Sequence, residues 1–233
     1  MQLIKDRDRD LKQFNPSRKL SVFADIQGVI EPYVSQYLQY KTKYGDKGLA
    51  KAVERVVDRV LSVAKESKVI ESTQGVTDAK ALQCISKIYF PLTNATSTLK
   101  DPNNRGTHYS LLVADLQNSI IYYLDSIDYN KVNKKQSKYI EGGIQILKGL
   151  YDHFGVTDTP PLRDWPVKTG SDCNVDPQTN QVDCGCFCVT YIDYLNDDIP
   201  LCHIKAADMS LYRKRYAVSL INKHLPYSLD CVE

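Results

Sequence analysis

The sequence predicts an α+β fold in which a small, mainly antiparallel sheet packs against helices. One observation behind this prediction is a pair of short β-rich runs separated by a turn-forming tripeptide, the pattern of an antiparallel hairpin. Another is the amphipathic helical spacing of hydrophobic residues in segments on either side of that pair. No internal repeat or linker divides the chain, so we expect one folded domain at residues 21–233 after a charged segment at 1–20.

Composition limits the classes of protein to consider. The chain has 233 residues, of which 42% are hydrophobic and 25% charged, as in globular domains. Its net charge of +2 argues against a protein that mainly grips nucleic acid or an anionic membrane. Its unbroken apolar runs are far shorter than the roughly 20 residues that cross a bilayer. We therefore expect neither nucleic acid nor a membrane as a partner; the oligomeric state is open, and a monomer is the default expectation.

The cysteines indicate a cellular compartment. There are seven of them, an odd number, and no secretion signal precedes them. This usage predicts reduced thiols and an intracellular location, nuclear or cytoplasmic, or inside a host cell for a secreted bacterial effector.

The first helix is expected at residues 46–67, where hydrophobic residues recur with helical spacing and charged residues occupy the opposite face. The apolar positions are Leu49, Ala52, Val53, Val56, Val57, Val60, Leu61 and Ala64. The charged segment at 1–20 carries six basic and three acidic side chains, and we assign it no function.

The strands are expected in the middle of the chain. A short strand at 85–91 is followed by a polar loop at 94–106. Two β-rich runs at 108–114 and 119–124 then flank the turn Leu116-Gln117-Asn118, which predicts the hairpin.

The remaining helices follow the hairpin. Residues 138–154 have helical hydrophobic spacing, and Gly155 is placed to end that helix. Two more helices are expected at 184–196 and 206–223. The intervening segment 157–182 contains four prolines and is expected to be irregular, and long ordered loops of this kind are often functional.

Cys184 is a candidate nucleophile because a loop runs into a helical pattern at this residue. The unpaired N–H groups and the positive end of the dipole at a helix start stabilise a thiolate. A buried structural thiol is the common role of a free cysteine. The context Asp183-Cys184-Gly185 favours the nucleophile, since Gly185 lets a substrate approach the backbone closely.

Three further residues complete a candidate catalytic set. His108 opens the first hairpin strand and Asp125 follows the second, so antiparallel pairing brings them together. An imidazole and a carboxylate placed in this way share a hydrogen bond through one ring nitrogen, and the other nitrogen can face a thiol. Gln178, in the loop before Cys184, is a candidate donor to the oxyanion.

Several segments of the chain resemble the SUMO-specific (ubiquitin-like) cysteine proteases. They are His108–Asp115, Tyr122–Ser126, Pro177–Asn180, Asp183–Gly185, Asp198–Leu201, Ala207–Met209 and Tyr212–Arg215. The resemblance implies that His108 is the general base, Asp125 its orienting partner, Cys184 the nucleophile and Gln178 the oxyanion donor. It also implies an α+β fold in which the sheet supplies His and Asp and a helix presents Cys.

The same resemblance implies the activity of a thiol protease. The protease would cleave the isopeptide or peptide bond after the C-terminal Gly-Gly of a ubiquitin-like modifier such as SUMO, ubiquitin or NEDD8. It would need no metal or organic cofactor. Tyr109 stands where the family usually has a tryptophan that covers the diglycine. Tyr109, Gly185 and Asp183 are therefore the expected substrate-binding residues. The family's N-terminal Trp-Leu-Asn-Asp element is not recognisable, which leaves the preferred modifier open.

Other functions remain compatible with this set of residues. Effector acetyltransferases use the same triad with acetyl-CoA, and adenovirus-type maturation proteases use it on structural proteins. A catalytically silent module that binds a ubiquitin-like protein is a further alternative, although a complete catalytic set argues against it. A zinc site is disfavoured because the usual C-x₂-C spacing is absent. Its ligands would be Cys184, Cys186, Cys188, Cys202 and His203.

Overall fold

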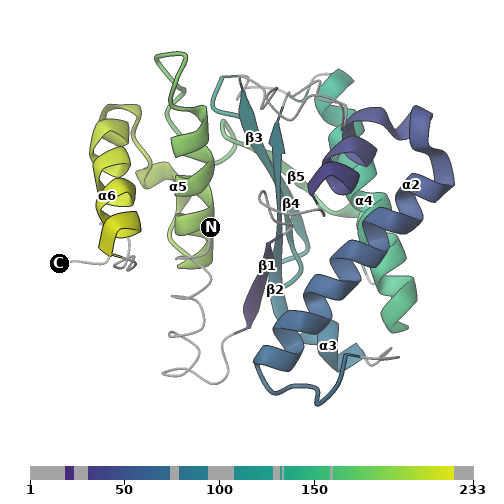
Figure 1. Cartoon of the computed structure of the whole chain (residues 1–233). Helices are drawn as coiled ribbons and strands as arrows, with labels where there is room; N and C mark the ends of the chain where they lie inside the picture. The colour runs from purple at the N-terminus through teal and green to yellow at the C-terminus, as the bar shows by residue number, and fades with distance from the viewer. Residues whose placement is uncertain are drawn as a thin grey trace.

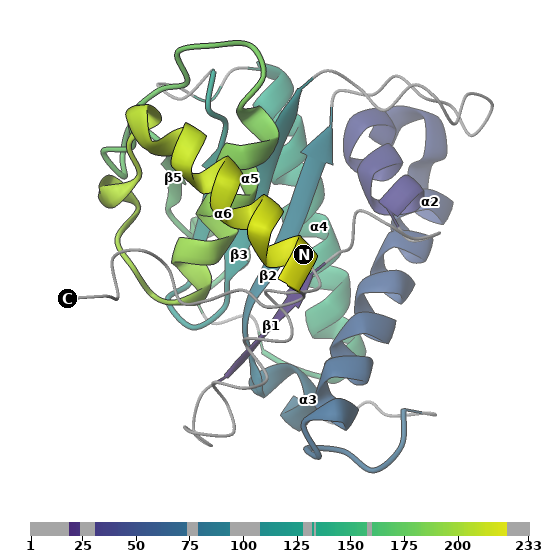
Figure 2. The same cartoon turned by 60° about the vertical axis from the view of Figure 1, so that its left-hand side comes forward.

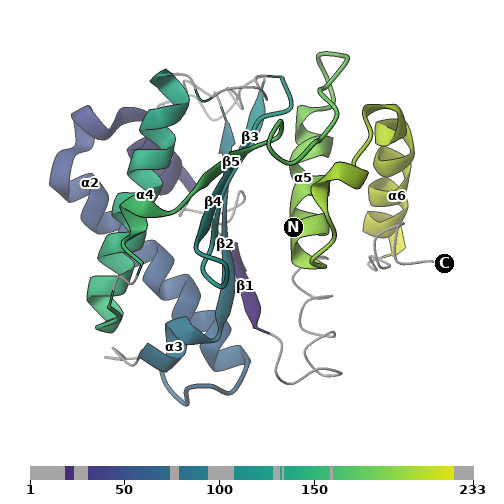
Figure 3. The ribbon, with the colours of Figure 1, turned by 180° about the vertical axis from the view of Figure 1, so that it is seen from behind.

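The structure has three layers, with a five-stranded sheet between two helical layers (Figure 1). The computed structural model describes residues 19–23, 31–73, 79–93, 108–127, 132, 134–157 and 160–222. One face of the sheet is covered by α5 (Cys184–Asn196), with α6 (Met209–Asn222) on the outer side of α5, and the other by α2 (Glu31–Glu66) and α4 (Lys134–Phe154). The view from behind shows the same order of layers (Figure 3). The predicted α+β fold is therefore confirmed.

The sheet is mixed. Its strands are β1 (Leu20–Phe23), β2 (Ile85–Thr93), β3 (Tyr109–Asp115), β4 (Ile120–Leu124) and β5 (Val167–Thr169), and they lie side by side in chain order. β3 pairs antiparallel with both β2 and β4, whereas the edge strands β1 and β5 pair parallel with their neighbours. Each parallel pair is connected through a helix, α2 or α4, because parallel strands need a crossover connection. The hairpin matches the prediction, and the parallel edges are the difference from it.

Some boundaries differ from those predicted. α2 begins at Glu31, well before the expected Asp46, because the hydrophobic repeat that predicts it starts only at Leu49. The segment 157–182, expected to be irregular, contains β5 and a 3₁₀ turn at Leu162–Asp164. Elements this short leave no periodic signal in a sequence. The short helix α3 (Ala79–Gln83) lies directly before β2. A 3₁₀ turn at Ala206–Asp208 lies directly before α6.

Two hydrophobic cores lie on opposite faces of the sheet. Leu112 and Ala114 of β3 belong to the core under α2 and α4, and Leu111 and Val113 belong to the core under α5 and α6. Successive strand residues point to opposite faces. Because both faces are covered, β3 is a nearly continuous hydrophobic run.

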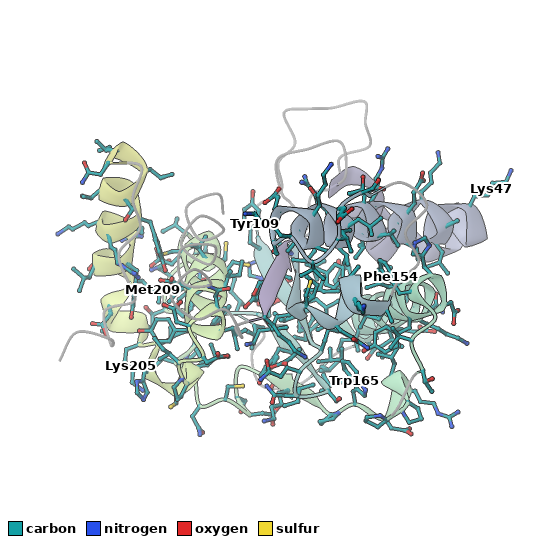
Figure 4. The ribbon with its side chains drawn as sticks, turned by 90° about the horizontal axis from the view of Figure 1, so that it is seen from below. Lys47, Tyr109, Phe154, Trp165, Lys205 and Met209 are labelled. Carbon is teal, nitrogen blue, oxygen red and sulfur yellow. The ribbon has the colours of Figure 1, made fainter. Side chains whose placement is uncertain are left out.

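The separation of the two cores is visible from below (Figure 4). Met209 of α6 lies on one side of the strand layer, and Phe154 and Trp165 lie on the other. Trp165, the chain's only tryptophan, is buried in the core under α4, and its indole N–H donates to the carbonyl of Pro160 at 3.0 Å. This tryptophan therefore serves packing.

A buried ion pair joins α5 to α6, which lies outside it (Figure 2). Arg215 Nη1 is 2.6 Å from Asp193 Oδ2, and the two side chains are 6% and 0% exposed. Tyr216 donates a further hydrogen bond to the same oxygen at 3.2 Å. Removing one partner of a buried pair costs about 3–5 kcal/mol. α6 thereby fixes the position of α5, the helix that begins at Cys184.

Several expectations concern residues outside the described ranges. These are nearly all of the charged segment 1–20, the loop at 94–106 and Lys223 at the expected end of the last helix. Among the helices in the described ranges, none is long and apolar enough to cross a membrane.

Gly149 provides a test of the packing between α4 and α2. A Cβ at Gly149 would lie 2.6 Å from Cγ2 of Val53 and 3.2 Å from its Cγ1. We expect Gly149→Ala to lower the free energy of unfolding by about 1 kcal/mol, because overpacking costs about 1–3 kcal/mol and alanine recovers about 1 kcal/mol of helix propensity. Urea unfolding measures this change. In a Val53→Ala background the cost should disappear, and an equal cost in both backgrounds would contradict the packing explanation.

Candidate active site

The start of β3 and the end of β4 meet at one end of the sheet, the upper end in Figure 1. Leu111 pairs with Leu124, so His108, just before β3, lies beside Asp125, just after β4. The distance from His108 Nε2 to Asp125 Oδ1 is 2.9 Å. The same oxygen accepts the backbone N–H of Ile127 at 3.0 Å, and Asp125 is only 5% exposed. The backbone thus orients the carboxylate, and the carboxylate can orient the imidazole.

Cys184 is the first residue of α5 and is largely buried. The first N–H groups of a helix have no acceptor within the helix, so the start of α5 offers donors beside the thiol. A Cβ on Gly185 would lie 3.8 Å from Cδ2 of Tyr109. Because Tyr109 follows His108 and Gly185 follows Cys184, this contact brings the two candidate catalytic segments together.

The side chain of Asp183 is directed into the protein. Its carboxylate contacts Nη1 of Arg213 on α6 and accepts a 2.5 Å hydrogen bond from Asn180 Nδ2. Asn180 Oδ1 in turn accepts the N–H groups of Val182 and Asp183 at 2.9 and 3.0 Å. Asp183 is 2% exposed. Its carboxylate is therefore bound by other residues of the protein. The substrate contact expected of Asp183 would have to come from its backbone.

Gln178 lies on the loop that leads to Cys184. Its backbone N–H donates to the carbonyl of Ser126 at 2.7 Å, and its Oε1 accepts the Ser126 hydroxyl at 2.6 Å. Its Nε2 donates to the carbonyl of Asn180. The structure therefore attaches the candidate oxyanion donor to the residue that follows Asp125.

Three other thiols, on α5 and on the segment before it, are wholly or partly buried. Burial raises the pKa of Cys186 to about 11, and the charge of Asp183 raises it further. Burial also raises the pKa of Cys188, which feels the charges of Cys184 and Asp125 as well. Burial raises the pKa of Cys173 to about 11. These three side chains are therefore protonated at neutral pH.

The zinc alternative receives no support from the described residues. All six cysteines that the structure describes are free thiols. Within the same ranges, no group of three or more His, Cys, Asp or Glu side chains is arranged to hold a metal ion.

This arrangement has the parts needed for acyl transfer. It places a thiol at a helix start, an imidazole oriented by a carboxylate, and an amide donor on the adjoining loop. Sequence reasoning did not identify Ser126, Asn180 or Arg213, which hold these parts in place. In the sequence, each is only a polar residue in or near a candidate catalytic segment. That position does not indicate which side chain it contacts.

A family model matches most of the chain. The model of the Ulp1 protease family, C-terminal catalytic domain, matches residues 53–225. This range includes all the candidate catalytic residues described above.

Curated relatives match over part of their length. Sentrin-specific protease 2 of Mus musculus is 29% identical over 124 residues, which are 53% of this chain and 20% of that protein. The Homo sapiens protein of the same name is 28% identical over 124 residues. The chain thus aligns with about a fifth of the length of these relatives.

Solved structures match over most of the chain. The catalytic domain of the Ulp1-like SUMO protease of Chaetomium thermophilum superposes with a TM-score of 0.58 at 18% identity, over 99% of this chain and 73% of that one. The Ulp1 protease domain in complex with Smt3, the yeast ortholog of SUMO, superposes with a TM-score of 0.50 at 18% identity, over 94% and 83%. At these identities the likeness shows a shared fold.

The raised pKa of Cys186 predicts which thiol of α5 reacts. With a pKa of about 11, Cys186 is a thiolate in roughly one molecule in ten thousand at pH 7. We expect iodoacetamide at pH 7 to modify Cys184 at the helix start and to leave Cys186 unmodified until the pH approaches 11. Peptide mass mapping checks this, with Cys184→Ser as the control. Equal modification of both thiols at pH 7 would contradict the prediction.

The contact between Arg213 and Asp183 predicts a loss of stability when the cation is removed. We expect Arg213→Met to lower the free energy of unfolding by about 1–3 kcal/mol, because the buried Oδ1 of Asp183 loses its cationic partner and keeps its desolvation cost, while Oδ2 keeps only the hydrogen bond from Asn180. Adding Asp183→Asn should recover part of the loss. Urea unfolding measures it, and Lys214→Met, at an exposed neighbouring position, is the matched control. A loss that is the same whatever residue occupies position 183 would refute the pairing.

Proposed function

Because the chain belongs to the Ulp1 protease family, we propose that it is a cysteine peptidase acting on a ubiquitin-like modifier. The proposed reaction cleaves the isopeptide or peptide bond after the modifier's C-terminal Gly-Gly. The observation that carries the proposal is the 2.9 Å contact between His108 and Asp125 at the end of the sheet next to the start of α5. This is the arrangement that activates a nucleophile at Cys184.

In the proposed reaction, His108 takes the proton of the Cys184 thiol, and the thiolate attacks the carbonyl carbon of the second glycine. Asp125 stabilises the imidazolium that forms. Gln178 Nε2 and the backbone N–H groups at the start of α5 stabilise the oxyanion. His108 then gives its proton to the leaving amine, and the modifier remains on Cys184 as a thioester. Water, deprotonated by His108, attacks the thioester and releases the modifier's carboxylate and the thiol.

Tyr109 and Gly185 are proposed to contact the diglycine. Their close approach leaves little width between the ring and the start of α5. An extended Gly-Gly segment has no side chains and can therefore pass close to an aromatic ring and to backbone. The side chain of Tyr109 would cover the two glycines in the role that a tryptophan fills elsewhere in the family.

SUMO is the modifier that we propose first. The matched curated relatives are sentrin-specific proteases, and the two matched structures described above are a SUMO protease and a complex with yeast SUMO. Ubiquitin and a NEDD8-like modifier are the alternatives. We propose that residues 21–233 act as a single catalytic domain in a monomeric, intracellular protein, either nuclear or cytoplasmic. The reaction requires no metal or organic cofactor.

Covalent capture and turnover test this function together. We expect the chain to form an adduct on Cys184 with a modifier that carries a C-terminal electrophile, and to hydrolyse the matching C-terminal fluorogenic modifier. Cys184→Ala should reduce turnover by roughly 10³-fold or more while modifier binding persists. Cys186→Ala, two residues away, is the matched control and should keep its activity.

Two results would contradict the proposal. One is retained cleavage by Cys184→Ala. The other is a folded chain that forms no adduct with SUMO, ubiquitin or NEDD8 probes, and acetyl transfer from acetyl-CoA by such a chain would indicate the acetyltransferase.

A further inference from the structure

Three consecutive residues after β4 contact both parts of the candidate catalytic machinery. Asp125 Oδ1 is 2.9 Å from His108 Nε2 and accepts the N–H of Ile127 at 3.0 Å. Ser126, between them, is 1% exposed and makes two hydrogen bonds to Gln178. The segment that orients the base therefore also holds the residue proposed to stabilise the oxyanion.

The Asn180 carbonyl and the Ser126 hydroxyl together determine how the Gln178 amide is turned. A carbonyl only accepts, so the NH₂ group faces Asn180, and the hydroxyl, which can donate or accept, donates to the remaining amide oxygen. Ser126 Oγ donates to Gln178 Oε1 at 2.6 Å. With the oxygen held there, the NH₂ group must point away from Ser126. It donates to the carbonyl of Asn180, in the loop that leads to Cys184.

The second hydrogen bond fixes the backbone of the same residue. The N–H of Gln178 donates to the carbonyl of Ser126 at 2.7 Å. Gln178 is thus held at its backbone and at its amide oxygen by a single buried residue. An amide NH₂ group carries two hydrogens, so donation to Asn180 leaves a second hydrogen for an oxyanion.

From this geometry we infer that Ser126 is a positioning residue that holds the Gln178 amide with its NH₂ group toward the oxyanion formed at Cys184. The inference rests on the proposed function and adds to it a determinant of the oxyanion site. Without the hydroxyl, the amide oxygen loses its donor, and the amide can move away from the position in which its second NH₂ hydrogen would reach the oxyanion. Ser126 contributes no atom to the reaction.

A double-mutant cycle between Ser126 and Gln178 tests the inference. Loss of one oxyanion donor lowers kcat by about 10²–10³-fold, and we expect this loss for Gln178→Ala. Ser126→Ala should lower kcat by about 10-fold or more with KM unchanged, because the NH₂ group is displaced and not removed. In the Gln178→Ala background, Ser126→Ala should change kcat by less than about 2-fold.

Three controls separate positioning from a general structural effect. The rate of Cys184 alkylation against pH should be the same in Ser126→Ala and in the unaltered chain, because the base and its carboxylate are intact. Ser126→Thr keeps the hydroxyl and should keep most of the activity. Ser210→Ala, at an exposed position on α6, should not change kcat. If Ser126→Ala does not fold, Ser126→Cys, with similar volume and a much weaker donor, replaces it in the cycle.

The outcomes are distinguishable. Absence of turnover by the unaltered chain on every modifier substrate would overturn the proposed function, and this inference with it. Normal turnover by Gln178→Ala would remove the amide from the mechanism and would also overturn the inference. A large loss for Gln178→Ala combined with an unchanged kcat for Ser126→Ala, or with equal losses for Ser126→Ala in both backgrounds, would overturn the inference alone.

Discussion

The pairing of β3 with β4 is the constraint on which the candidate site depends. His108 and Asp125 are 17 residues apart in the chain, and the antiparallel register brings them to 2.9 Å. Because successive residues of β3 enter different cores, a slip by one residue would exchange the environments of Leu111 and Leu112. Packing on both faces therefore fixes the register. The hydrophobic interior therefore sets the geometry of the candidate site, and the contact between the imidazole and the carboxylate forms within it.

The predictable parts of the fold are those with a local signal. β3 and β4 were readable as a hairpin because two β-rich runs flank a short turn, and α4 ends where Gly155 adopts a left-handed φ of 60°. β1 and β5 were not readable, since they have only four and three residues. Their strand conformation comes from pairing with β2 and β4, which are distant in the sequence. The mixed character of the sheet is thus a tertiary property that no local pattern records.

The same division applies to the candidate site. Cys184, His108 and Asp125 lie at the ends of regular elements, so their placement follows once those elements are recognised. Asp183 was expected to face the substrate, but its carboxylate is engaged by Arg213, 30 residues later on another helix. The partner of a polar side chain is chosen by three-dimensional packing, and the spacing of residues along the chain does not contain that choice. For this reason the placement of the candidate catalytic residues could be predicted from the sequence, and the residues that hold them in place could not.

The two cores differ in how directly they act on the candidate site. Within the described residues, the candidate catalytic side chains lie at the ends of β3 and β4, on α5 and on the loop before it, and α2 and α4 carry none of them. A substitution beneath α2 and α4 reaches the candidate site through the register of β3, whereas a substitution beneath α5 and α6 can also move the helix that carries Cys184. The position of Cys184 is therefore most sensitive to packing on one side of the sheet. The outer faces of α2 and α4 lie on the opposite side, so changes to the surface there leave the immediate surroundings of the candidate site unaltered.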